Sequence, residues 1–129
     1  MDFSGLNEFI TAQGASLKKG PIAIIFVEDD VEVESTLAHH IALGFKQVLV
    51  LAPRLPDISD DVLIDVTTIT FDPFQKFAVR DAINRLMPHM AGSWVFTCFN
   101  AEYLYFPFPN LGALANSWRF TPKNAVILC

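Results

Sequence analysis

The sequence has few basic residues and no long hydrophobic run. Nine lysines and arginines stand against fourteen acidic residues, so the net charge at neutral pH is −5. Nucleic-acid binding and docking on an anionic membrane both need a clustered basic surface, and neither is expected. Apolar runs such as residues 22–27 and 48–52 have the length of a strand, far below the roughly 18 residues of a membrane span. Polar residues at 2, 7 and 8 interrupt the segment that a secretory signal would keep apolar, so we expect a cytoplasmic protein.

Common motifs of nucleotide binding, metal binding and nucleophilic catalysis are also absent. The six glycines are dispersed, and none forms a glycine-rich phosphate loop. The sequence contains no CxxC pair and no GxSxG turn. Of the two cysteines, Cys98 lies in an apolar strand pattern and is predicted to be a buried thiol, and Cys129 is the last residue. The adjacent His39 and His40 would point about 100° apart on a helix, so we do not expect them to share a metal ion. His40 lies near the apolar stripe and is expected to be a core or interface histidine.

Hydrophobic residues make up 52% of the 129 residues, which is enough for one domain with a sizeable core. We expect residues 1–20 to form a polar leader and residues 21–129 a single α/β domain. A helix is expected to open at Asp72, with Phe74 and Phe77 in its buried stripe. Strands are expected at residues 22–27, 47–52, 62–71, 93–99 and 125–129. This alternation predicts a three-layer fold, a mostly parallel sheet with helices on both faces.

The acidic segment 28–34 leads into another expected helix. Asp29 or Asp30 is predicted to cap this helix, and Gly44 to end it. Acidic residues in a first turn also suit the positive end of the helix dipole. A solvated helix start is therefore one interpretation of the charge cluster.

The other interpretation is a ligand site, because open α/β sheets bind ligands outside the carboxyl ends of their strands. This rule selects Glu28, Asp29 and Asp30 after the first expected strand, and Asn100 with Glu102 after the fourth. Oxygen ligands at such a place suit a divalent metal, and carboxylates accept hydrogen bonds from a ribose.

Aromatic residues gather in the stretch Tyr103–Phe108. Pro107 and Pro109 exclude a central strand there. Core packing or an oligomer surface is the favoured interpretation, and a stacking platform for sugars or bases is the alternative. Beyond it, residues 111–118 are compatible with a short helix.

Three features follow one another along the chain: an apolar strand that ends in an acidic turn, the segment Ala38-His-His-Ile-Ala-Leu-Gly-Phe45, and the segment Trp94-Val-Phe-Thr-Cys-Phe-Asn-Ala-Glu-Tyr-Leu104. Over roughly residues 21–108 this order resembles the N-terminal half of a family 2-type glycosyltransferase. Members of one branch carry a tyrosine-histidine pair and Leu-Gly after the first helix, and a tryptophan-led strand ending in Asp-x-Asp-Glu-Phe. The resemblance implies a GT-A fold that binds a nucleotide-diphospho-sugar at the strand ends. It also implies a divalent metal, Mn²⁺ or Mg²⁺, on the Asp-x-Asp carboxylates.

Individual residues carry the resemblance to different degrees. His40 matches the family histidine, and Glu28 matches the acidic position after the first strand. The resemblance thus implies that Glu28, Asp29 and Asp30 contact the nucleoside of the donor.

The metal site depends on the alignment of the fourth strand. With Trp94 on the family tryptophan, Glu102 falls on the family glutamate, and Phe99 and Ala101 stand where the family has its metal-binding aspartates. A shift of one residue places Asn100 and Glu102 on the Asp-x-Asp pair. The metal would then have one neutral oxygen and one carboxylate from this motif.

Three functional hypotheses follow. The leading one is a glycosyltransferase-like domain that transfers a sugar from a nucleotide-sugar donor, short or truncated because the family's second half exceeds the residues after Phe108. The alternative is a non-catalytic α/β interaction module or pseudoenzyme that forms a homodimer through its aromatic edge. The third is a receiver-like regulatory domain, suggested by the acidic turn 28–30.

Overall fold

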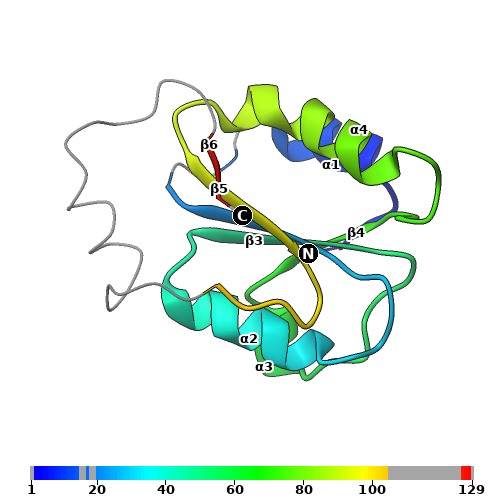
Figure 1. Ribbon diagram of the computed structural model, residues 1–129, viewed down its shortest axis with the longest axis vertical. Helices are drawn as coiled ribbons and strands as arrows, with labels where there is room; N and C mark the ends of the chain where they lie inside the picture. The colour runs from blue at the N-terminus through cyan, green and yellow to red at the C-terminus, as the bar shows by residue number, and fades with distance from the viewer. Residues whose placement is uncertain (1, 15–16, 18–19, 105–125, 129) are drawn as a thin grey trace.

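The computed structural model describes residues 2–14, 17, 20–104 and 126–128. Six parallel strands form one sheet in the order β1-β4-β3-β2-β5-β6, and helices cover both faces (Figure 1). The strands are β1 (Asp2–Phe3), β2 (Ile22–Phe26), β3 (Gln47–Ala52), β4 (Thr67–Thr70), β5 (Trp94–Phe99) and β6 (Val126–Leu128). The helices are α1 (Leu6–Gln13), α2 (Val33–Leu43), α3 (Asp60–Leu63), α4 (Ala78–Leu86) and the 3-10 helix η2 (Met87–Met90). The predicted three-layer α/β fold is confirmed.

Each face of the sheet has its own hydrophobic core. Helices α1 and α4 lie on one face, and α2 and α3 lie on the other (Figure 1). Every residue of β2 is buried, because this central strand is covered on both faces, and its side chains alternate between the two cores. Among the helices in the described part of the chain, none has the length and apolar character to cross a membrane.

The first twenty residues contain part of this fold, so the expected polar leader is wrong. Strand β1 pairs with β4 at the edge of the sheet, and the side chains of Asp2 and Thr68 are hydrogen-bonded. Helix α1 then buries Leu6 and Phe9 against the α4 face. The apolar residues Leu6, Phe9 and Ile10 fall at helical spacing, which is the signal for α1.

The single strand expected at residues 62–71 is two elements. Residues 60–63 form α3, and only Thr67–Thr70 form β4. Ser59 stands at the N-cap position, and Asp60 and Asp61 occupy the first turn of α3, where acidic residues are favourable. The β-branched composition of the whole stretch concealed this short helix.

The helix expected to open at Asp72 begins at Ala78 instead. The Asp72 carboxylate accepts a hydrogen bond from the Phe74 N–H at 2.9 Å, which holds a turn rather than a helix. Phe77 then has φ 62°, a left-handed conformation that interrupts any continuous helix. Phe74 and Phe77 are 69% and 53% exposed, so their assignment to the buried stripe is wrong.

Helix α2 ends as predicted but begins differently. Gly44 has φ 99° and its N–H donates to the Ile41 carbonyl, so it ends the helix. Glu32, rather than Asp29 or Asp30, occupies the N-cap position, and no side chain caps the helix there. Asp29 instead accepts a hydrogen bond from the Val31 N–H within the preceding turn.

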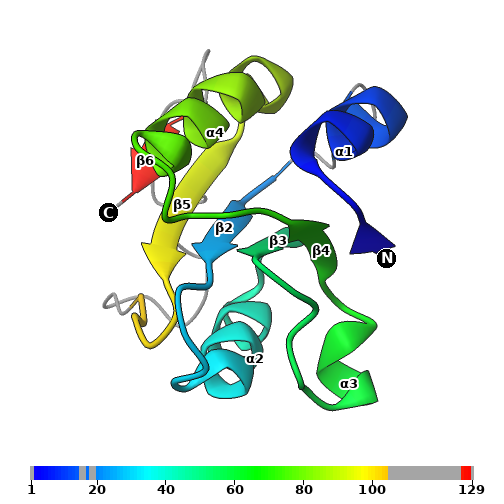
Figure 2. The same ribbon diagram turned by 90° about the vertical axis from the view of Figure 1, so that its right-hand side faces the viewer.

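The connections of β2 and β5 create a switch point at the carboxyl edge of the sheet. From β2 the chain runs through α2 to β3, its neighbour on one side, and β5 is its neighbour on the other side. The connection into β5 runs through α4 and then η2, and α4 lies on the opposite face from α2 (Figure 2). Such switch points are where open α/β sheets leave room for a ligand.

Candidate functional site

The turns after β2 and β5 meet at the carboxyl edge, as the strand order requires (Figure 2). Asn100, which is 5% exposed, joins them. Its Oδ1 accepts a hydrogen bond from the Glu28 N–H at 3.0 Å. Its Nδ2 donates to Asp29 Oδ1 at 2.6 Å and to the Val31 carbonyl at 2.7 Å. The two turns expected from the sequence are therefore brought together by one buried amide.

The residues expected to hold a metal are both engaged with protein groups. Asn100 makes the contacts above, and Glu102 Oε1 accepts a hydrogen bond from the Phe99 N–H at 2.7 Å. Across the described residues, no group of three or more His, Cys, Asp or Glu side chains has a metal-binding arrangement. Asn100 and Glu102 therefore do not form a ready-made cation site.

A cavity of about 390 Å³ lies between the turns after β2 and β3. Its lining residues are Val27, Glu28, Asp29, Asp30, Pro53 and Arg54. All three acidic residues predicted to bind a cofactor thus line one cavity. Hydrogen bonds from the Val31 N–H and then from Asn100 hold the pKa of the Asp29 carboxyl below its usual range, so Asp29 is an anion at neutral pH.

Arg54 is a cavity residue that sequence reasoning missed. It pairs with Asp30 at 3.2 Å, and both side chains are largely exposed, at 79% and 87%. A pair so exposed contributes little to stability and exchanges readily with solvent and ligands. The signal in the sequence was its position directly after a strand, at the same edge as the acidic turn.

Helix α2 presents a row of polar side chains to the turn after β5. Ser35 Oγ contacts the Tyr103 hydroxyl at 2.6 Å, and Thr36 Oγ1 accepts a hydrogen bond from the Ala101 N–H at 2.8 Å. His40 is fully buried beside this row, as expected for a core or interface histidine. Of the aromatic stretch 103–108, Tyr103 and Leu104 fall within the described residues.

Cys98 lies in β5 beneath this turn and is buried, as predicted. Burial, with a smaller contribution from the charge of Glu102, raises the pKa of the Cys98 thiol to about 12. The thiol is therefore protonated at neutral pH and unsuited to act as a nucleophile. Cys129 and residues 111–118 lie outside the described part of the chain.

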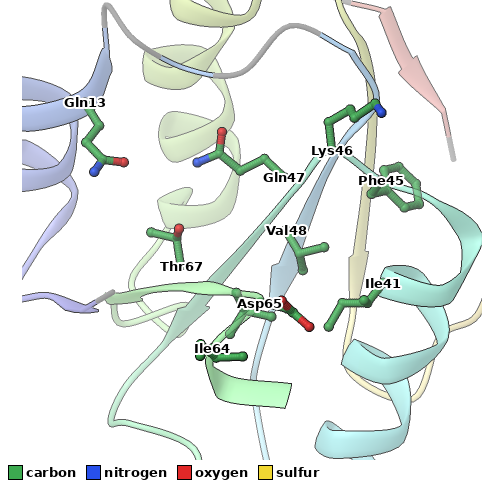
Figure 3. Close-up of a pocket in the computed structure, with 10 residues that line it drawn as sticks. Gln13, Ile41, Phe45, Lys46, Gln47, Val48, Ile64, Asp65 and Thr67 are labelled. Atoms are coloured by element: carbon green, nitrogen blue, oxygen red, sulfur yellow. The ribbon is translucent and has the colours of Figure 1, made fainter. Parts of the chain in front are cut away.

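A second cavity, of about 480 Å³, lies at the opposite, amino edge of the sheet (Figure 3). Gln13 of α1 and Gln47 of β3 extend toward one another across it, and Lys46 and Asp65 also line it. None of the site residues expected from the sequence lies here.

Comparisons with known proteins returned nothing for this chain: no family model, no curated protein and no solved structure matches it.

Proposed function

We propose that this chain is a glycosyltransferase-like domain that binds the nucleoside part of a nucleotide-diphospho-sugar at the carboxyl edge of β2 and β3. The observation that carries the proposal is the cavity lined by Glu28, Asp29 and Asp30 beside the switch point. Ribose hydroxyls are hydrogen-bond donors, and three carboxylates on one turn supply the acceptors. The family resemblance and the α/β architecture agree with this assignment.

The diphosphate requires a positive partner, because the turn after β2 is strongly negative. Arg54 lines the same cavity, and its exposed pair with Asp30 leaves it able to turn toward a phosphate. In the resembling family a divalent metal supplies this charge. Here Glu102 would have to release the Phe99 N–H before its carboxylate could contribute to a metal site. We therefore propose donor binding at this cavity, with Arg54 as the positive partner of the diphosphate.

Isothermal titration calorimetry with UDP-, GDP- and CMP-sugars, with and without Mn²⁺, tests the proposal. We expect one of the donors to bind. Glu28→Gln and Asp30→Asn each remove a carboxylate from the cavity and should weaken that binding about tenfold, the usual cost of losing a charged hydrogen-bond acceptor. Asp65→Asn is the matched control, an exposed carboxylate at the amino edge. Its affinity should equal that of the wild type.

The outcomes are distinct. No heat with any donor contradicts the proposed function. If Asp65→Asn weakens donor binding as much as Glu28→Gln does, the acidic turn after β2 is not the specific binding site. If Glu102→Ala binds the donor as tightly as the wild type, with and without Mn²⁺, Glu102 does not belong to the site.

A second candidate function is the interaction module, favoured by two exposed aromatic side chains after β4. Phe74 and Phe77 are more than half exposed, and Arg80 lies over the Phe77 ring at 4.2 Å. Exposed aromatic and arginine side chains together are typical of protein interfaces. Sedimentation velocity tests this candidate: a dimer that Phe74→Ser converts to monomer supports it, and a monomer at high concentration contradicts it.

A further inference from the structure

Contacts between α2 and the turn after β5 end at two adjacent histidines. We call residues 100–104 the 100–104 turn. His39 and His40 both contact the backbone of Leu104, the last residue of this turn. In the first contact the histidine donates the hydrogen bond, and in the second it accepts it.

His39 donates its hydrogen bond. Its Nε2 lies 2.8 Å from the Leu104 carbonyl oxygen, which can only accept. Protonation of the imidazole preserves the Nε2–H. The contact made by His39 therefore persists in either charge state.

His40 accepts its hydrogen bond. Its Nδ1 lies 2.8 Å from the Thr36 carbonyl, so Nδ1 must carry the proton and Nε2 must be bare in the neutral ring. The bare Nε2 receives the Leu104 N–H at 3.4 Å. A proton added to His40 would sit on Nε2 and face another N–H, so the contact cannot survive protonation.

We propose that His40 makes the attachment of the 100–104 turn to α2 pH-sensitive: the neutral imidazole accepts the Leu104 N–H, and protonation of Nε2 breaks this hydrogen bond and leaves the turn held only by its contacts with Ser35, Thr36 and His39. The ring is fully buried, stacked on Phe96 at 5.2 Å and close to Phe45 at 5.9 Å, so the surroundings offer a cation little solvation. The inference concerns the turn itself and does not depend on donor binding.

Titratable groups on the neighbouring elements do not compensate the charge. His39 on α2, with its ring 5.1 Å away, opposes a second positive charge, and the Cys98 thiol on β5 is neutral. Tyr103 on the turn contacts His39 and Ser35, and the Glu102 carboxylate is bonded to the Phe99 N–H. Consistent with this geometry, burial lowers the pKa of His40, and the hydrogen bond to Thr36 only partly opposes the effect.

The broken hydrogen bond would affect the candidate site through Asn100. The same turn carries this amide, which holds the backbone of Glu28 and Val31 in place. Loss of the hydrogen bond from the Leu104 N–H to His40 therefore loosens the acidic turn after β2 without disturbing the pairing of β2 and β5. The consequence is a carboxyl edge that is ordered at neutral pH and loosened in acid.

Nuclear magnetic resonance of the ¹⁵N-labelled full chain tests the proposal. Long-range ¹H–¹⁵N spectra near pH 8 should show His40 as the Nδ1–H tautomer. Hydrogen exchange of the Leu104 and Ala101 amides, corrected for intrinsic rates, should accelerate by up to about tenfold for each pH unit below the pKa of His40. Amides in the middle of β2 should keep their protection.

Variants separate the protonation of His40 from other acid effects. His40→Gln keeps an acceptor for Leu104 but cannot be protonated, so its exchange should no longer accelerate in acid. His39→Gln keeps a donor, and His89→Gln lies on η2, so both should retain the acceleration. An Nε2–H tautomer, or acceleration that persists in His40→Gln, overturns the proposal. If His40→Gln does not fold, two measurements on the wild type still test the proposal. They are the tautomer of His40, and whether Leu104 exchange accelerates over the same pH range in which His40 titrates.

Discussion

The two edges of the sheet differ in the residues that adopt left-handed backbone conformations. At the amino edge, the turns leading into β2, β3 and β5 contain Gly20, Gly44 and Gly92, all with positive φ. At the carboxyl edge, the segments after β2, β4 and β5 contain Glu32, Phe77 and Ala101 in the same region. Glycine adopts this conformation without a steric penalty, whereas residues with a Cβ are strained in it.

This difference is consistent with the proposed placement of the binding site at the carboxyl edge. Backbone strain tends to persist where the surrounding contacts enforce it, and such places are often functional. The amino edge has a cavity of about 480 Å³, yet its turns place glycine at the positive φ angles. The carboxyl edge combines strain, a buried amide between two turns and most of the exposed large hydrophobic side chains of the described residues.

The largest loss of stability should come from removing the Asn100 side chain, which joins the two turns at the carboxyl edge. Asn100→Ala removes three hydrogen bonds that a buried side chain makes to the turn after β2. We expect it to lower the free energy of unfolding by about 3 kcal/mol, measured by urea denaturation. Asn84→Ala on the exposed side of α4 is the control and should change it by less than about 0.5 kcal/mol. Equal effects of the two variants would mean that the amide does not organise this edge.

A smaller destabilisation is expected from Asn100→Asp. The variant keeps the acceptor for the Glu28 N–H but places an oxygen against Asp29 Oδ1, which now lies 2.6 Å from the amide nitrogen. Two carboxylates at this distance repel each other and attract a divalent cation. Differential scanning fluorimetry should therefore show a lower midpoint that millimolar Mn²⁺ raises again. An unchanged midpoint with Mn²⁺ would contradict any metal-binding capacity of this turn.

Exchanging the residue types between the edges should produce effects of opposite sign. Gly44→Ala puts a Cβ at φ 99°, and because nothing lies within 4 Å of that Cβ, the cost of about 1 kcal/mol is backbone strain alone. Ala101→Gly relieves strain at φ 66° and should be neutral or stabilising by up to about 1 kcal/mol. Gly5→Ala, with extended backbone and open space, is the control. Chemical denaturation measures all three, and a destabilising Ala101→Gly would show that the carboxyl edge is not strained.

The pH dependence of stability should carry a still smaller contribution from His40. Burial lowers its pKa below the ordinary value of 6.5, so as pH falls the unfolded chain is protonated before the folded protein. This contribution is complete above about pH 6.5 and declines as pH falls through the lowered pKa. The lowered pKa values of Asp29 and Glu34 change the pH dependence of stability only below about their ordinary values of 3.8 and 4.5. Denaturation between pH 5 and 8 should therefore be flatter for His40→Gln than for the wild type, and parallel curves would contradict the assignment.

No measurable effect on stability is expected at the Arg54–Asp30 pair. Both side chains are mostly exposed, so solvent screens their attraction. Arg54→Gln should leave the unfolding midpoint unchanged while weakening the binding of a nucleoside diphosphate relative to its nucleoside. A variant that lowers the midpoint and the affinity together would point to a structural role for the pair.

The buried strands were predictable because their signal is local. Residues 22–26 and 48–52 are continuous apolar runs, and a run covered on both faces needs no information about its partner. Strand β1 was not predictable, since two residues have no periodicity and depend on β4 for their conformation. Phe74 and Phe77 were misassigned because their spacing suits a helix, whereas the Asp72 turn and the left-handed Phe77 prevent one.

The position of the candidate site was predictable, but its internal structure was not. Glu28, Asp29 and Asp30 follow a strand, and parallel strands end at one edge, so their clustering follows from topology. The hydrogen bond from Glu28 to Asn100 joins residues 72 positions apart, and that from Ala101 to Thr36 joins residues 65 apart. Side-chain partners at such separations depend on the packed geometry and leave no periodic signal in the sequence.

The parallel pairing of every described strand pair also determines how the chain must assemble. Parallel neighbours are never joined by a tight hairpin, and β2 pairs with β5 in a register that sets Ile22 opposite Val95. Contacts of this kind close long loops, which slows folding relative to proteins built from local contacts. During synthesis, one side of the apolar β2 strand stays unpaired until residue 99 has left the ribosome. Recombinant yield should therefore improve with slow translation at low temperature and with chaperones that shield exposed strands.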